Sequence, residues 1–186
     1  MTEICVPLSF LKASLKMIKE SEKKKLRLFS ASASAMCNPY DSLWLKGHIL
    51  YCGNNKLVLY HLLSSAQVPA PLLDEERYTF TRQDIEDVLS DPFKKKQSWV
   101  TIELKTVKPQ VIFYVESFER ILFEYSTNSA RDLPEISPMI LAEVAEYLVT
   151  FKDSSFMLCS TSKQDMLCFR EEYGGLKVAI NFITKL

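Results

Sequence analysis

The sequence predicts an α+β protein in which antiparallel sheets carry about three amphipathic helices on one face. The spacing of hydrophobic residues along the chain changes repeatedly between about 3.6 residues, which is typical of a helix, and 2 residues, which is typical of a strand. The resulting order is one helix and three strands, repeated three times. This unit recurs at intervals of about 55 to 65 residues, although no residue motif repeats with it.

Residues 7–24 form the first predicted helix, in which Pro7 is tolerated in the first turn. Apolar side chains recur at intervals of three and four along one face: Leu8, Leu11, Leu15 and Ile18. Basic side chains form a second stripe at similar spacing: Lys12, Lys16, Lys19 and Lys23. The apolar face of this helix is therefore expected to pack on a sheet, and its lysines are expected to lie on a different face.

The period becomes two after Lys25, which predicts a strand ending in "FSASASA". Next, residues 43–52 and 56–64 are predicted to be two strands joined by a tight turn at 53–55, "GNN". Residues 66–80 contain two prolines and three consecutive acidic residues. This composition indicates an exposed connection.

A second helix is predicted over 81–92, with Thr81 as its N-cap and Asp84 three residues later. Ile85, Val88 and Leu89 share its apolar face, and Pro92 closes it. Three basic residues follow directly, where cations meet the negative end of a helix: Lys94, Lys95 and Lys96.

Three strand-like runs follow, at 98–107, 109–115 and 119–127. The polar stretch 127–136 is the best candidate for a boundary, so we expect a helix-plus-sheet domain over 1–128. A helix opened by Ser137 and Pro138 and three strands within 155–183 then form a second part, 129–186, packed on the first as one unit.

Composition restricts the class of protein and its partners. The chain has 186 residues, of which 47% are hydrophobic, and its 23 basic and 23 acidic residues give no net charge that would attract nucleic acid or a membrane globally. Five scattered cysteines favour reduced thiols, and no apolar stretch is long enough to span a bilayer. We therefore expect an intracellular protein, in the cytosol or the nucleus, with no membrane partner. Of these two locations we expect the nucleus.

Residue patterns for catalysis and metal binding are missing. The sequence contains no C-x-x-C pair, its two histidines stand thirteen residues apart, and neither G-x-S-x-G nor S-x-x-K with its companion motifs occurs. Only four glycines are present, too few for a glycine-rich nucleotide loop. We expect no enzyme activity, no metal site and no small-molecule cofactor.

The lysine stripe supports two interpretations. Lys12, Lys16, Lys19 and Lys23, extended by the Lys94–Lys96 cluster, could hold a phosphate backbone through counterion release without recognising sequence. The alternative is an ordinary solvated helix face, on which Glu20 and Glu22 partly cancel the lysines.

Three stretches together resemble the sliding-clamp family, which includes proliferating cell nuclear antigen and the checkpoint clamp. These are "SFLKASLKMIKESEKKKLRLFSASASA", "TRQDIEDVLSDPFKKKQSWVTIEL" and "PMILAEVAEYLVTFKDSSFMLCSTSKQDMLCFREE". A clamp subdomain also has a short strand before its first helix, for which "TEICV" is available. The resemblance implies basic helices facing duplex DNA, with lysines as nonspecific phosphate contacts. It also implies other protein subunits as partners and no catalysed reaction.

A second hypothesis is an adaptor that accepts a partner peptide or subunit along a strand edge or in an apolar groove, without nucleic-acid contact. In that case the lysines only keep the protein soluble. The clamp-like hypothesis requires the helices at 7–24 and 81–92 to lie side by side on one face of a continuous sheet.

Overall fold

The fold is described from a computed structural model, in residues 2–23, 39–53, 57–64, 77–107, 145–147, 151, 156–160, 166–171 and 176–181. Its helices are α1 (Leu8–Lys23) and α3 (Arg82–Ser90), with two short 3₁₀ turns, η1 (Pro39–Asp41) and η2 (Lys94–Lys96). The strands are β1 (Thr2–Pro7), β2 (Ser42–Lys46), β3 (Ile49–Gly53), β4 (Leu57–Leu62), β5 (Arg77–Thr81), β6 (Trp99–Thr106), β7 (Phe156–Ser160), β8 (Met166–Glu171) and β9 (Leu176–Asn181).

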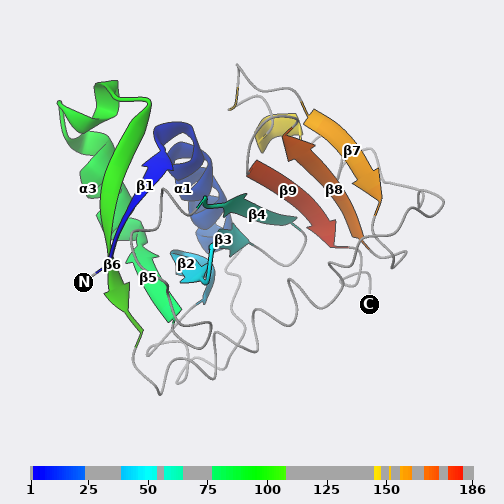
Figure 1. The fold of residues 1–186 in the computed structure, drawn as a ribbon, viewed down its shortest axis with the longest axis horizontal. Helices are drawn as coiled ribbons and strands as arrows, with labels where there is room; N and C mark the ends of the chain where they lie inside the picture. Colours follow the sequence, from blue (N-terminus) through cyan, green and yellow to red (C-terminus); the bar gives the residue numbers. More distant parts are fainter. Residues whose placement is uncertain are drawn as a thin grey trace.

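These strands form one sheet in the order β1-β6-β5-β2-β3-β4-β9-β8-β7, and every pair of neighbours is antiparallel (Figure 1). The first strand pairs with β6 along its whole length, from Thr2 opposite Leu104 to Pro7 opposite Trp99. β4 pairs with β9 and so connects the early strands to the late ones. The predicted α+β class is confirmed.

The helices pack on one face of this sheet. α1 contacts β1 and β3, α3 contacts β5, and the two helices contact each other. Figure 1 shows them next to each other. Leu45, Leu50 and Leu59 come from β2, β3 and β4 and belong to the same hydrophobic cluster as the buried residues of both helices. The side-by-side placement of the two predicted helices is therefore confirmed.

α1 begins one residue after the predicted start and buries a wider face than its leucines indicate. Phe10 and Met17 are buried together with the predicted Leu11 and Ile18, whereas Leu15 is only partly buried. Two serines also enter the core, because their hydroxyls donate to carbonyls four residues earlier in the helix: Ser14 to Phe10 at 2.7 Å and Ser21 to Met17 at 3.0 Å.

The prediction of a single strand over 43–52 was wrong. The chain turns at Gly47 and His48, so that β2 and β3 form a hairpin in which Lys46 faces Ile49. Gly47 adopts a φ of 57°, a left-handed conformation that glycine reaches at low cost. Apolar residues on both sides of the turn made the two strands look like one.

The prediction that 66–80 is an exposed connection was wrong at its C-terminal end. Residues 77–81 form β5, which lies between β2 and β6 and buries Tyr78 and Phe80. The alternation in "RYTFT" is a strand pattern that the preceding prolines and acidic residues outweighed. Residues 65–76 lie outside the described part of the chain.

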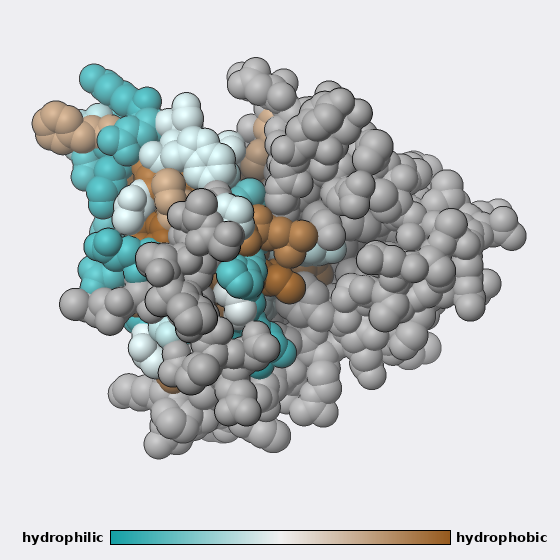
Figure 2. All heavy atoms as spheres, in the orientation of Figure 1, coloured by the Kyte–Doolittle hydropathy of each residue, from teal (hydrophilic) through white to brown (hydrophobic). Residues whose placement is uncertain are grey.

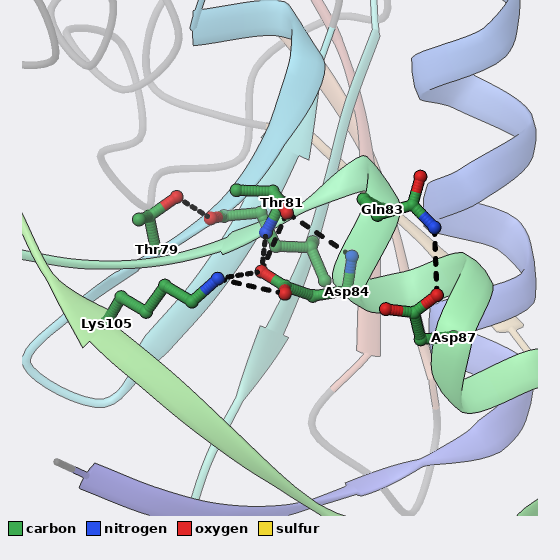
Figure 3. Close-up of polar contacts among 7 residues, drawn as sticks. Thr79, Thr81, Gln83, Asp84, Asp87 and Lys105 are labelled. Atoms are coloured by element: carbon green, nitrogen blue, oxygen red, sulfur yellow. Dashed lines mark hydrogen bonds and ion pairs between the residues drawn. The ribbon is translucent and has the colours of Figure 1, made fainter.

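The start of α3 confirms the predicted cap. The Thr81 hydroxyl accepts from the backbone N–H of Asp84, and Oδ2 of Asp84 accepts from the backbone N–H of Thr81 at 2.9 Å (Figure 3). Lys105 of β6 reaches both carboxylate oxygens of Asp84, at 3.0 and 3.2 Å. The cap thus also connects the helix to the sheet.

Several predictions fall partly or wholly outside the described residues. The strand after Lys25, the runs at 109–115 and 119–127, and the boundary between 128 and 129 lie there entirely. The division into two domains stays a prediction. Of the third predicted helix, residues 145–147 are described and helical, and Tyr147 belongs to the buried core.

Candidate nucleic-acid interface

The four lysines of α1 line one open depression. Its volume is about 470 Å³, and its walls are Lys12, Leu15, Lys16, Lys19, Glu20, Lys23 and, from α3, Leu89. Spacings of four, three and four residues place the lysines along one side of the helix, over about three turns. The sheet supports α1 from behind. The depression is therefore a basic surface made largely by one helix.

Lys16, in the middle of this row, is held by the helical segment 145–147. Its ammonium lies 3.5 Å from Oε2 of Glu146 and donates to the backbone carbonyl of the same residue at 3.2 Å. The ammonium also lies 5.1 Å from the centre of the Tyr147 ring, a cation–π distance. Much of the charge of Lys16 is thus offset within the protein.

Tyr147 makes a second contact with α1. Its hydroxyl donates to Oε2 of Glu20 over 2.5 Å. Burial raises the pKa of Tyr147, and the hydrogen bond to the Glu20 carboxylate raises it further, so the phenol stays protonated well above its ordinary range. The carboxylate of Glu20 is therefore already hydrogen-bonded to Tyr147.

Lys19 pairs across the helices with Glu86 of α3, at 3.6 Å. Arg82 donates to the same carboxylate at 3.2 Å and also forms an ion pair with Glu22. These contacts connect the two helices at the C-terminal end of α1. The side chains are partly exposed, so each pair contributes little to stability, about 0 to 1 kcal/mol.

Lys12 and Lys23 form no ion pair with another described residue. Both are exposed, one towards each end of α1. The positive charge that remains for a ligand is therefore concentrated at the two ends of the row. Glu20 and Glu22, which the sequence indicated as the cancelling acids, bind Tyr147 and Arg82. The lysines Lys16 and Lys19 instead pair with Glu146 and Glu86 from other segments, and the residue spacing within α1 does not reveal these partners.

Lys94, Lys95 and Lys96 form η2 and do not line the depression. The turn lies close to the start of α1, because the backbone N–H of Leu8 donates to the carbonyl of Ser98 at 2.9 Å. The structure therefore places the predicted site residues in two groups, four along α1 and three beyond its N-terminal end.

Within the described residues, no group of three or more histidine, cysteine or acidic side chains could hold a metal ion. No described helix combines the length and the apolar character needed to cross a membrane.

Comparisons with known proteins assign no family. No family model matches the sequence, and no curated protein matches it. Among solved structures, the chain is similar to a candidate DNA polymerase III beta subunit from Eubacterium rectale, with a TM-score of 0.48 and 8% identity. The match covers 97% of this chain and 64% of that one, so the chain spans less than two thirds of that protein. This similarity is too weak to show that the chain belongs to a family.

Proposed function

We propose that this protein is a non-enzymatic assembly subunit that docks on the backbone of duplex DNA through the lysine row of α1. The observation that carries the proposal is the convergence of Lys12, Lys16, Lys19 and Lys23 on one open wall that a sheet supports from behind. The two helices that the clamp-like hypothesis requires side by side, α1 and α3, contact each other, but the lysines of this wall come from α1 alone. The other protein subunits of the assembly, its nuclear location and the absence of catalysis stay predictions.

The spacing of the row suits a polyanion. Lys12 and Lys23 are separated by roughly 16 Å along the helix axis, from a rise of 1.5 Å per residue. Duplex DNA carries one charge for about every 1.7 Å of its axis, so both lysines meet phosphates without any requirement for base sequence. Lys16 and Lys19 contribute when a phosphate replaces Glu146 or Glu86 as their partner.

The proposal is tested by fluorescence anisotropy of a labelled duplex titrated with the protein between about 50 and 200 mM salt. We expect weak binding whose logarithm falls with the logarithm of the salt concentration, with a slope of about −2 to −4 for two to four phosphates. Reversing the charge of Lys12 and Lys23 together should abolish the binding.

Lys46→Glu is the matched control for each single reversal, because it changes the net charge equally at an exposed position of β2 outside the depression. Equal losses in Lys12→Glu, Lys23→Glu and Lys46→Glu would show a general charge effect and remove the proposed site. If the wild-type chain does not bind duplex DNA at the lowest salt concentration, the result would favour the adaptor hypothesis.

A further inference from the structure

The turn between α3 and β6 exposes two aromatic side chains on either side of its lysines. Phe93 is 82% exposed and Trp99 is 48% exposed, and both flank Lys94, Lys95 and Lys96 in "FKKKQSW". The third large apolar side chain exposed in the described residues, Leu62, is 37% exposed and lies in β4. Where the chain turns after α3 in Figure 1, Figure 2 shows a hydrophobic group protruding among hydrophilic ones.

Trp99 is held in place by the sheet. It is the first residue of β6, where it lies opposite Pro7. Its ring stands edge-on to the ring of His61 of β4, with centroids 6.4 Å apart and an angle of 62° between the planes. Because His61 is itself buried against Phe10 at 5.6 Å, the exposed part of Trp99 is presented on a firm support.

Phe93 is held by the shape of its turn. Oδ1 of Asp91 accepts from the backbone N–H groups of Phe93 at 2.8 Å and Lys94 at 3.3 Å, and the carbonyl of Asp91 accepts from Lys95 at 3.0 Å. These bonds fix the backbone, so Phe93 projects into solvent from an ordered turn. Because the backbone is already ordered, only the side-chain torsions of Phe93 lose freedom when the ring binds a ligand.

The turn continues the basic row of α1. Ser98, next to Trp99, accepts from the first backbone N–H of α1, which places the turn at the end of the helix where Lys12 lies. A polyanion that leaves the row at Lys12 therefore reaches lysines and two aromatic faces together. Lysines beside exposed aromatic rings are the combination that binds single-stranded nucleic acid, through phosphates and stacked bases.

We propose that Phe93 and Trp99 stack on unpaired bases, so that the protein prefers a duplex that ends in a single-stranded extension over a blunt duplex. This inference rests on the proposed binding of DNA by α1 and specifies its substrate. An extended strand is favoured over an anionic membrane as the ligand, because the turn lies next to the start of α1, the helix to which the duplex is proposed to bind.

The test compares blunt and extended duplexes of the same double-stranded length by fluorescence anisotropy. We expect the single-stranded extension to tighten binding by about five- to tenfold. Phe93→Ala and Phe93→Leu should reduce this gain to the part that Trp99 contributes and keep the affinity for the blunt duplex, whereas Phe93→Tyr should retain the full gain. Leu62→Ala, which removes an exposed apolar side chain from β4, is the control and should retain it as well.

Trp99 provides a direct signal. The chain has two tryptophans, and the other, Trp44, is 3% exposed. We expect an unpaired oligonucleotide to quench the fluorescence of Trp99, and Trp99→Phe to remove the quenching while the emission of Trp44 persists.

The outcomes separate the two proposals. Binding to both duplexes with no gain from the extension would overturn the role of the turn and leave the α1 proposal standing. Binding to neither would overturn the α1 proposal, and the inference with it. Binding to phosphatidylserine vesicles that Phe93→Leu retains and Phe93→Ala loses would identify a membrane contact and also overturn the inference.

Discussion

The hydroxyl of Tyr147 lies 2.5 Å from Oε2 of Glu20, a residue 127 positions earlier in the chain. This hydrogen bond and the neighbouring pair of Lys16 with Glu146 connect the helical segment 145–147 to the middle of α1. The side of α1 that carries the lysines therefore also holds a late part of the chain in place.

Tyr147→Phe removes this hydrogen bond while keeping the buried ring. We expect the free energy of unfolding to fall by about 1 to 2 kcal/mol, because Glu20 loses a donor to its charged carboxylate. Urea unfolding followed by circular dichroism measures the change. Tyr147→Leu should cost more, because it also removes aromatic packing from the core. A Tyr147→Phe variant as stable as the wild type would show that the hydrogen bond contributes nothing.

The same residue predicts alkaline instability. Burial, and then the hydrogen bond to Glu20, raise the pKa of Tyr147 above its ordinary value, so the folded state keeps a proton that the unfolded state releases above about pH 10. Stability is therefore complete below that pH and falls as the pH rises beyond it. Tyr147→Phe should show a shallower fall, with a residual slope from Tyr40, whose pKa burial also raises.

Removing the carboxylates that pair with the lysine row should strengthen DNA binding. In Glu86→Gln and Glu146→Gln, Lys19 and Lys16 lose their charged partners and become available to phosphates. We expect each substitution to tighten duplex binding by about two- to threefold and to steepen the salt slope by up to about one unit. Glu103→Gln, on the exposed side of β6, changes the net charge equally and should have a smaller effect.

The cap of α3 should make stability depend on acid pH. Burial raises the pKa of Asp84, but hydrogen bonds from Thr81 and Lys105 outweigh burial and hold the pKa below its ordinary value. The cap therefore stabilises the fold above about pH 4, and this contribution is lost as the pH falls through the folded-state pKa. We expect Thr81→Ala to lower the free energy of unfolding by about 1 kcal/mol at neutral pH. In Asp84→Asn, the free energy of unfolding should fall less steeply as the pH is lowered below about 4.

The turn between β2 and β3 should depend on glycine. At a φ of 57°, Gly47→Ala forces an alanine into the left-handed region, and we expect a loss of about 1 to 2 kcal/mol. Gly47→Asn should cost less, because asparagine tolerates this conformation. Thermal unfolding of both variants measures the difference. Equal losses would show that the cost comes from adding any side chain and not from the left-handed backbone conformation.

The sequence predicted α1 and α3 well because their signals are local. The lysine and leucine spacing of α1, the Thr81 cap and the Pro92 stop each involve neighbours in the chain. β5 was missed although its alternation is local, because the prolines and acidic residues before it indicated a connection, and its partners β2 and β6 come from distant segments. The ion pairs of Lys16 and Lys19 were missed for the second of these reasons. Their acidic partners lie on other elements, and periodicity within one helix says nothing about them.

The pairing of β1 with β6 has a consequence for synthesis of the chain on the ribosome. Each residue of β1 lies opposite a residue of β6 that follows about a hundred positions later in the chain. At about 5 to 20 residues per second, β1 is synthesised roughly 5 to 20 s before the strand with which it pairs. During that interval Ile4 and Val6, which are buried in the finished protein, are exposed to chaperones and to other unfinished chains.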